Sequence, residues 1–236
     1  MTIEGAPARV VIGEREVPFM VRRNNRARRL LLRVETITGV VVLTLPKRAS
    51  LADGMRFVQA NAGWALARLE RLPAALPFAD GASVPIRGAA HIIRHRPGMR
   101  GTAWLEGGEL HVAGRPEHVG RRVRDFLVRT AREEFARRAR ELALRTGRAP
   151  GRVSIRDGKS RWGSCASNGN LAFSWRILMA PEPVIDYLIA HEVAHLRHMN
   201  HGPGFWALVG ELAQDVEGAR RWLRRHGAEL HRYGPA

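Results

Sequence analysis

The sequence predicts an α+β fold, with a β-rich region over residues 1–114 that contains one helix, followed by a largely helical region over residues 115–236. Three observations support this prediction. Short apolar segments separated by turn-forming residues recur as far as Val112, which is typical of strands. From Pro116 onward, apolar residues recur at helical spacing. Within the second region, the motif His191-Glu192-Val193-Ala194-His195 is predicted to lie on a helix.

The first region begins with an alternating segment, residues 9–20, which predicts a hairpin around Gly13 whose second strand is weakened by a proline. Two further strands are expected on either side of a turn at Thr38-Gly39, and Ser50 is suited to cap the helix that comes next. The expected elements after the first hairpin are strands Leu30–Val34 and Val40–Leu45, a helix from Leu51 to about Leu72, and strands Val84–Ile86, His91–Arg94, Thr102–Leu105 and Glu109–Val112.

The second region is expected to alternate one long helix, a short β-hairpin and further helices. Pro181 is suited to the start of the motif-bearing helix, and Asn168-Gly169-Asn170 is a hairpin-type turn. The expected elements are a helix from Pro116 to about Thr146, strands Val153–Arg156 and Leu171–Arg176, the helix with the histidine motif, a helix beginning near Phe205, and a helix over Gly218–His226. The sequence shows no repeat and no low-complexity segment.

The composition points to a basic protein without disulfides. The 236 residues carry a formal charge of +17, and all cationic side chains except Lys47 and Lys159 are arginines. Such a surface attracts anionic partners, including nucleotides and nucleic acids. Cys165 is the single cysteine, so no internal disulfide can form. We expect a cytoplasmic protein, because residues 1–9 do not resemble a targeting leader and no apolar run reaches the length of a membrane span.

The histidine motif has the spacing of a catalytic metal site. Residues four apart stand on one face of a helix, so His191 and His195 can bind the same ion. Glu192 projects about 100° away from the first histidine and can act on a water molecule without being a ligand. A catalytic zinc site has three protein ligands and a fourth position open for water, so one more ligand is needed.

His198 and His201 compete for the third ligand position. On a continuing helix His198 would lie about 10 Å along the axis from the first histidine, which is too far for ligand bonds of about 2 Å. The segment Gly202-Pro203-Gly204 predicts that the helix ends and the chain turns back. This favours His201 as the ligand and leaves His198 a supporting or surface role. Glu211 and Glu217 are fallback ligands.

The segment before the motif is suited to form one wall of a substrate cleft. An edge strand there can hold an extended peptide by backbone pairing, and Lys159 and Arg161 are suited to bind carboxylate or phosphate groups. We assign Lys159, Arg161, Trp162 and Tyr187 to substrate binding, with Arg161 and Tyr187 as the alternatives for a donor to the developing oxyanion. Cys165 is expected to be a small buried residue rather than a ligand.

Several short segments together resemble a known family. They are Arg161-Trp162-Gly163-Ser164-Cys165, Asn170-Leu171, Trp175-Arg176, Ala180-Pro181, Val184-Ile185-Asp186-Tyr187, the histidine motif, and Asn200-His201 with Phe205-Trp206. This combination resembles the YgjP-like metal-dependent hydrolases, which are grouped with zinc metallopeptidases and are similar to the SprT-like and WLM-type DNA–protein crosslink proteases. The resemblance implies a minimal zincin-like catalytic domain at about 115–236, with His191, His195 and His201 as ligands and Glu192 as general base.

We therefore predict a zinc-dependent hydrolase, a metallopeptidase in which Glu192 activates a zinc-bound water to cleave peptide bonds. One alternative is a metal-dependent nucleotide pyrophosphatase or other phosphoanhydride hydrolase, which would use Mg²⁺ or Mn²⁺. Another is a DNA-associated protein with a protease site or a structural zinc site, although structural sites normally have four protein ligands. The expected partner is accordingly a protein or peptide, an anionic nucleotide, or DNA at the basic surface.

Overall fold

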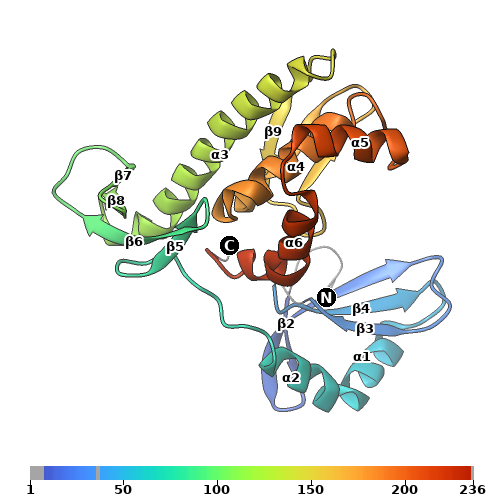
Figure 1. Ribbon diagram of the computed structural model, residues 1–236. Helices are drawn as coiled ribbons and strands as arrows, with labels where there is room; N and C mark the ends of the chain where they lie inside the picture. The colour runs from blue at the N-terminus through green and yellow to red at the C-terminus, as the bar shows by residue number, and fades with distance from the viewer. Residues whose placement is uncertain (1–7, 36–37, 235–236) are drawn as a thin grey trace. The chain divides into compact units, whose positions relative to one another are not determined.

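The computed structural model describes residues 8–35 and 38–234, and these divide into two compact units. The first unit extends to Ala74 and the second begins at Ala75 (Figure 1). The expectation that residues 1–9 are not a targeting leader falls mostly on residues 1–7, which lie outside the described residues. Within the described ranges, no helix is both long and apolar enough to cross a membrane.

The first unit is a four-stranded sheet covered on one face by two helices. Its sheet has the strand order β1-β2-β4-β3, and the buried residues Phe19 and Leu43 from the sheet pack with Val58 and Ala65 from the helices. This separate core stabilises the unit by burying apolar side chains. Its elements are β1 (Ala8–Ile12), β2 (Arg15–Asn24), β3 (Leu31–Val34), β4 (Val41–Pro46), α1 (Leu51–Ala60) and α2 (Ala62–Glu70).

The single helix expected between Leu51 and about Leu72 is instead two helices. Ser50 caps the first one as predicted, because its hydroxyl oxygen accepts a hydrogen bond from the Asp53 backbone N–H at 3.0 Å. The break falls at Asn61, whose φ of −110° and ψ of 19° are not helical. The Asn61 side-chain amide donates to the Phe57 carbonyl at 2.8 Å. Asparagine side chains compete for backbone groups in this way, which explains why the helix is interrupted here.

The second unit contains a four-stranded sheet, a three-stranded sheet and a set of helices. The strand orders are β5-β6-β8-β7 and β10-β11-β9. The elements are β5 (Ser83–Ile86), β6 (Ala89–Arg96), β7 (Ala103–Glu106), β8 (Glu109–Ala113), the 3-10 helix η1 (Pro116–His118), α3 (Val119–Leu144), β9 (Val153–Arg156), β10 (Gly163–Cys165), β11 (Leu171–Ser174), the 3-10 helix η2 (Trp175–Met179), α4 (Glu182–Ala194), α5 (Pro203–Leu212) and α6 (Val216–Leu230).

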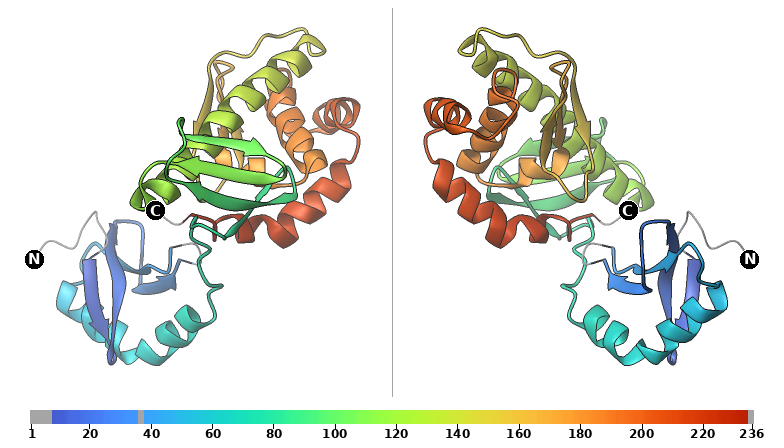
Figure 2. Two further views of the ribbon diagram at one scale, coloured as in Figure 1. Left: turned by 90° about the vertical axis from the view of Figure 1, so that its left-hand side faces the viewer. Right: turned by 90° about the vertical axis from the view of Figure 1, so that its right-hand side faces the viewer.

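The four-stranded sheet of the second unit shares its core with the helices that follow it. Val84, Ile93 and Leu110 from the sheet belong to the same buried cluster as Leu127 on α3 and Ile189 on α4. Figure 2 shows this sheet lying along the N-terminal part of α3. The compact units therefore divide after Ala74, whereas the predicted division lies between residues 114 and 115. A catalytic domain confined to 115–236 stays a prediction.

The two four-stranded sheets have the same topology, although the sequence shows no repeat. In each, the strands stand in the order first-second-fourth-third, the central pair is parallel and both outer pairs are antiparallel. Across the last three strands, Phe19, Val41 and Val34 stand side by side in the first sheet, as do Ile93, Leu110 and Leu105 in the second. In both units the next helix, α1 or α3, packs on the fourth strand. The two sheets resemble each other in the pairing of their backbones. Many different sequences are compatible with one pairing pattern, so the sheets need not share a sequence repeat.

Candidate metal centre

Helix α4 carries His191, has His195 as its C-cap residue, and is fixed in the middle of the second unit. Its Val184, Ile185, Ile189 and Val193 side chains are buried in the core, and it contacts α3, α5, α6 and β10. His191 and its neighbour one turn later have ring centroids 5.1 Å apart. A helix held by packing on several sides presents these two rings on one face with little freedom.

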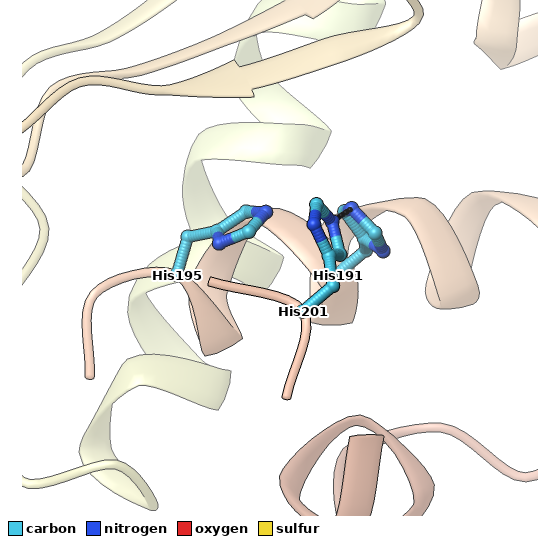
Figure 3. A group of neighbouring side chains, drawn as sticks. All are labelled: His191, His195 and His201. Atoms are coloured by element: carbon cyan, nitrogen blue, oxygen red, sulfur yellow. Dashed lines mark hydrogen bonds between the residues drawn. The ribbon is translucent and has the colours of Figure 1, made fainter. Parts of the chain in front are cut away.

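The chain turn after α4 brings His201 to this pair. The helix ends at Ala194, and the next helix, α5, begins at Pro203 after Gly202 in an extended conformation. His201 Nε2 lies 3.2 Å from His191 Nε2, and the candidate ligand nitrogens of all three histidines lie within 4.8 Å of one another. Figure 3 shows the three rings directed toward a common point. Two nitrogens bound to one tetrahedral zinc ion at about 2.0–2.1 Å are about 3.3 Å apart, so the 3.2 Å between His191 Nε2 and His201 Nε2 matches two ligands of one ion.

His198 contributes through its backbone. Its carbonyl oxygen lies 3.0 Å from His195 Nδ1. A carbonyl can only accept, so His195 donates from Nδ1 and its Nε2 keeps a free lone pair. Neither Glu211 on α5 nor Glu217 on α6 is in the group: within the described residues, the three histidines are the one cluster of His, Cys, Asp or Glu side chains close enough to hold an ion.

Glu192 lies beside the cluster against the neighbouring strand. It is 5% exposed, and no described residue donates a hydrogen bond to its carboxylate. Its side chain packs so closely on Gly163 of β10 that a Cβ atom there would lie 2.7 Å from its Cγ and 2.8 Å from its Cδ. Only glycine permits this approach. A buried carboxylate without a donor is costly unless another group, such as a water molecule, binds it.

Burial lowers the pKa of His191 and His195 and raises the pKa of Glu192. It lowers the pKa of His191 to about 4, and the neighbouring His195 and His201 add to this effect. Burial also lowers the pKa of His195, although the hydrogen bond to the His198 carbonyl opposes the shift. Neutral imidazoles are the form that binds metal ions. For Glu192, burial raises the pKa to about 7 and the positive charge of Arg161 partly opposes it.

The three histidines and Glu192 open into a cleft of about 380 Å³. Its remaining wall is formed by β10 and by exposed side chains on either side, and the lining residues besides these four are Arg161, Gly163, Ser164, Cys165 and Met199. Because β10 pairs with β11 alone in its sheet, it is an edge strand with one row of backbone groups unpaired by that sheet. Cys165 lies in the wall but outside the histidine group, and burial followed by the charge of Glu192 raises the pKa of its thiol.

The predicted substrate residues fall in different places. Arg161 lines the cleft. Trp162 instead packs toward α6, where its ring stacks on His231 at a centroid distance of 4.8 Å. The Tyr187 hydroxyl lies 3.4 Å from His191 Nδ1, and Lys159 is not among the residues that line the cleft.

Some contributors to the site were not recognised from the sequence as part of it. Phe205 is 1% exposed and its ring centroid lies 4.5 to 5.0 Å from those of the three histidines, so it forms an apolar floor beneath them. The sequence could have indicated this role, because Phe205 follows directly after Gly202-Pro203-Gly204. A turn that brings His201 to the other histidines also brings the start of α5 close to them. Nothing in the sequence indicates the contact between Gly163 and Glu192, which joins residues on different elements.

Comparison with known proteins gives one family. A family model described as "YgjP-like, metallopeptidase domain" matches residues 28–226, which is most of the chain. No curated protein matches. Among solved structures, the crystal structure of the metallopeptidase zymogen of Pyrococcus abyssi abylysin is similar at 24% identity with a TM-score of 0.35, over 43% of this chain and 96% of that chain. A TM-score this low does not assign the two chains to one fold.

Proposed function

Because this chain belongs to the YgjP-like metallopeptidase family, we propose that it is a zinc-dependent peptidase in which His191, His195 and His201 hold the ion and Glu192 is the general base. The observation that carries the proposal is the convergence of three imidazoles whose candidate ligand nitrogens lie within 4.8 Å of one another, beside a buried glutamate and an open cleft. A bound zinc ion supplies a Lewis acid that acidifies a water molecule and polarises a peptide carbonyl.

The proton transfers fall to Glu192. Its carboxylate faces the cleft and is held in place by the close contact with Gly163. In the proposed reaction a Glu192 oxygen takes a proton from the attacking water and returns it to the nitrogen of the leaving amine. Glu192 as a residue is 5% exposed, so the cleft is the side from which water reaches its carboxylate.

The shape of the cleft supports an extended peptide as the substrate. The edge strand β10 offers unpaired backbone N–H and C=O groups next to Glu192, and an extended peptide can pair with such an edge. Arg161 lies on the same wall and is suited to bind a substrate carboxylate or the developing oxyanion. Roles for Lys159 and Trp162 in substrate binding stay predictions. The stacking of Trp162 on His231 favours a different role for Trp162, in which it anchors its own segment of chain.

The two alternative functions have less support. A phosphoanhydride hydrolase that uses Mg²⁺ or Mn²⁺ needs oxygen ligands, and within the described residues no carboxylate cluster accompanies the three histidines. A structural zinc site is normally closed by a fourth protein ligand, whereas this group of three opens into a cleft. Neither observation favours nucleotides or DNA as partners over peptides.

The test of the proposed function combines metal content with activity. The wild type purified without added metal should contain about one zinc per chain by mass spectrometry, and His201→Ala should lose most of it because two histidines hold zinc weakly. Glu192→Gln should keep its zinc and lose cleavage of unstructured protein substrates. Zinc retained in full by His201→Ala, or cleavage retained by Glu192→Gln, would refute the assigned roles.

A further inference from the structure

His191 and His195 each have a second ring nitrogen with a partner outside the cluster, and that partner decides which tautomer forms. For His195 the partner is the His198 carbonyl at 3.0 Å, which forces Nδ1 to carry the proton. Histidines that bind metal ions generally donate from their other nitrogen to such a partner, which fixes the ring and leaves the lone pair on the metal side.

His191 has a different partner. Among the described residues, the group within hydrogen-bonding distance of its Nδ1 is the Tyr187 hydroxyl, at 3.4 Å, on the same helix one turn earlier. His191 Nε2 faces His201 Nε2 at 3.2 Å, so Nδ1 and Nε2 have separate partners on the two sides of the ring. The Tyr187 and His191 rings meet edge to face at a centroid distance of 5.8 Å.

The Tyr187 side chain is held firmly enough to act as such a partner. The residue is 6% exposed and belongs to the core of the second unit. A hydroxyl can accept as well as donate, so the bond has two possible directions. If Nδ1–H of His191 donates to the tyrosine oxygen, Nε2 keeps the lone pair that a metal ion needs. If the tyrosine donates to Nδ1, the proton sits on Nε2 and blocks metal binding.

We propose that Tyr187 is a positioning residue, which accepts a hydrogen bond from His191 Nδ1–H and thereby directs the His191 Nε2 lone pair toward the three-histidine cluster. The inference rests on the proposed function, because it gives Tyr187 a role in holding the ligand set. It differs from the substrate-binding role predicted from the sequence, since the tyrosine oxygen contacts a ligand histidine rather than lining the cleft.

Zinc affinity and the tautomer of His191 test this inference separately from catalysis. Tyr187→Phe removes one oxygen and keeps the ring that packs in the core. We expect its zinc dissociation constant, measured by competition with a fluorescent chelator, to rise about 10- to 100-fold. Tyr233→Phe is the matched control, because it removes the hydroxyl of the other tyrosine, whose backbone carbonyl makes its described hydrogen bond to Arg176. The control should bind zinc as the wild type does.

The second measurement is ¹⁵N NMR of the metal-free full-length protein at neutral pH. The wild type should show His191 protonated at Nδ1, and Tyr187→Phe should shift it toward a mixture of tautomers while the melting temperature of the metal-free protein stays close to that of the wild type. Equal zinc affinity in Tyr187→Phe and wild type would overturn the inference and leave the proposed function standing. A wild type with His191 protonated at Nε2 would also overturn it, even if the variant failed to fold. A wild type that binds no zinc would instead overturn the proposed function.

Discussion

The contact between Gly163 and Glu192 can be tested by adding one methyl group. In Gly163→Ala the new Cβ would lie 2.7 Å from Cγ and 2.8 Å from Cδ of Glu192, and closer still to Oε1. The carboxylate oxygen Oε1 would have to retreat by about 1 Å to restore ordinary van der Waals contact. The three atoms nearest to the added methyl group all belong to Glu192, so the histidines should keep their positions.

The expected result is a loss of turnover with little loss of zinc. A displacement approaching 1 Å of a catalytic group costs up to about 100-fold in rate, so we expect kcat/KM for a peptide substrate to fall about 10- to 100-fold. Overpacking should destabilise the protein by roughly 1 kcal/mol, at the low end of its usual range, because the displaced group is a side chain rather than backbone. Metal content should remain at the wild-type level.

Two controls separate this effect from a general effect of alanine. Gly210→Ala, on α5, adds a methyl group with no atom within 4 Å and should leave activity unchanged. In a Glu192→Ala background the steric conflict is absent, so Gly163→Ala should cost less stability there than in the wild type. If Gly163→Ala retained kcat/KM within about twofold of the wild type, the carboxylate would not be held where the structure places it, and the reasoning would be refuted.

Further predictions concern stability. Arg176→Ala should destabilise the second unit by about 3–5 kcal/mol in denaturant unfolding. The Arg176 side chain is 6% exposed and donates hydrogen bonds to Asp157 and to the backbone carbonyls of Leu230 and Tyr233. The control is Arg137→Ala, whose ion pair with Glu141 is exposed, and an equal loss of stability in the two variants would contradict this prediction. Burial raises the pKa of Asp157, but the hydrogen bonds and ion pair with Arg176 lower it by a larger amount, so the net shift is downward. Stability from this carboxylate is therefore present above its unfolded pKa and is lost as the pH falls through its lowered folded value. Urea unfolding below about pH 4 should show this loss in the wild type and not in Asp157→Asn. Phe19→Ala should lower the stability of the first unit by about 3–5 kcal/mol, because Phe19 is buried in the core of that unit. The zinc content should stay unchanged, and a loss of zinc would count against separate cores.

The sequence predicted the parts of the site that depend on local spacing. His191 and His195 are one helical turn apart, and Gly202-Pro203-Gly204 correctly indicated that the chain would turn and bring His201 back. The supporting role predicted for His198 agrees with the position of its backbone carbonyl, which lies 3.0 Å from His195 Nδ1. These inferences succeed because helix geometry fixes the positions of side chains up to about one turn apart.

The sequence could not predict features that depend on contacts between distant elements. The break at Asn61 depends on whether its side chain bonds to its own helix, and apolar periodicity does not reveal that choice. The boundary after Ala74 reflects a shared core, because Val84 and Ile93 belong to the same buried cluster as Leu127 on α3. The catalytic domain at about 115–236 that the family resemblance implied stays a prediction. The parallel pairing of β2 with β4, which skips the intervening strand β3, also requires long-range contacts, so the repeated strand order was not visible in the sequence.

The two cores have a consequence for how the protein responds to heat. The buried residues around Phe19 and those around Phe135 form clusters with no member in common, although each cluster is built on a sheet of the same strand order. A chain with two such cores need not unfold in a single cooperative step, and calorimetry should then resolve two transitions. Zinc at a concentration 100 times its dissociation constant adds about 2.7 kcal/mol to the species that binds it. Only the transition of the second unit should therefore move upward with zinc, which makes the first unit an internal reference in the same scan.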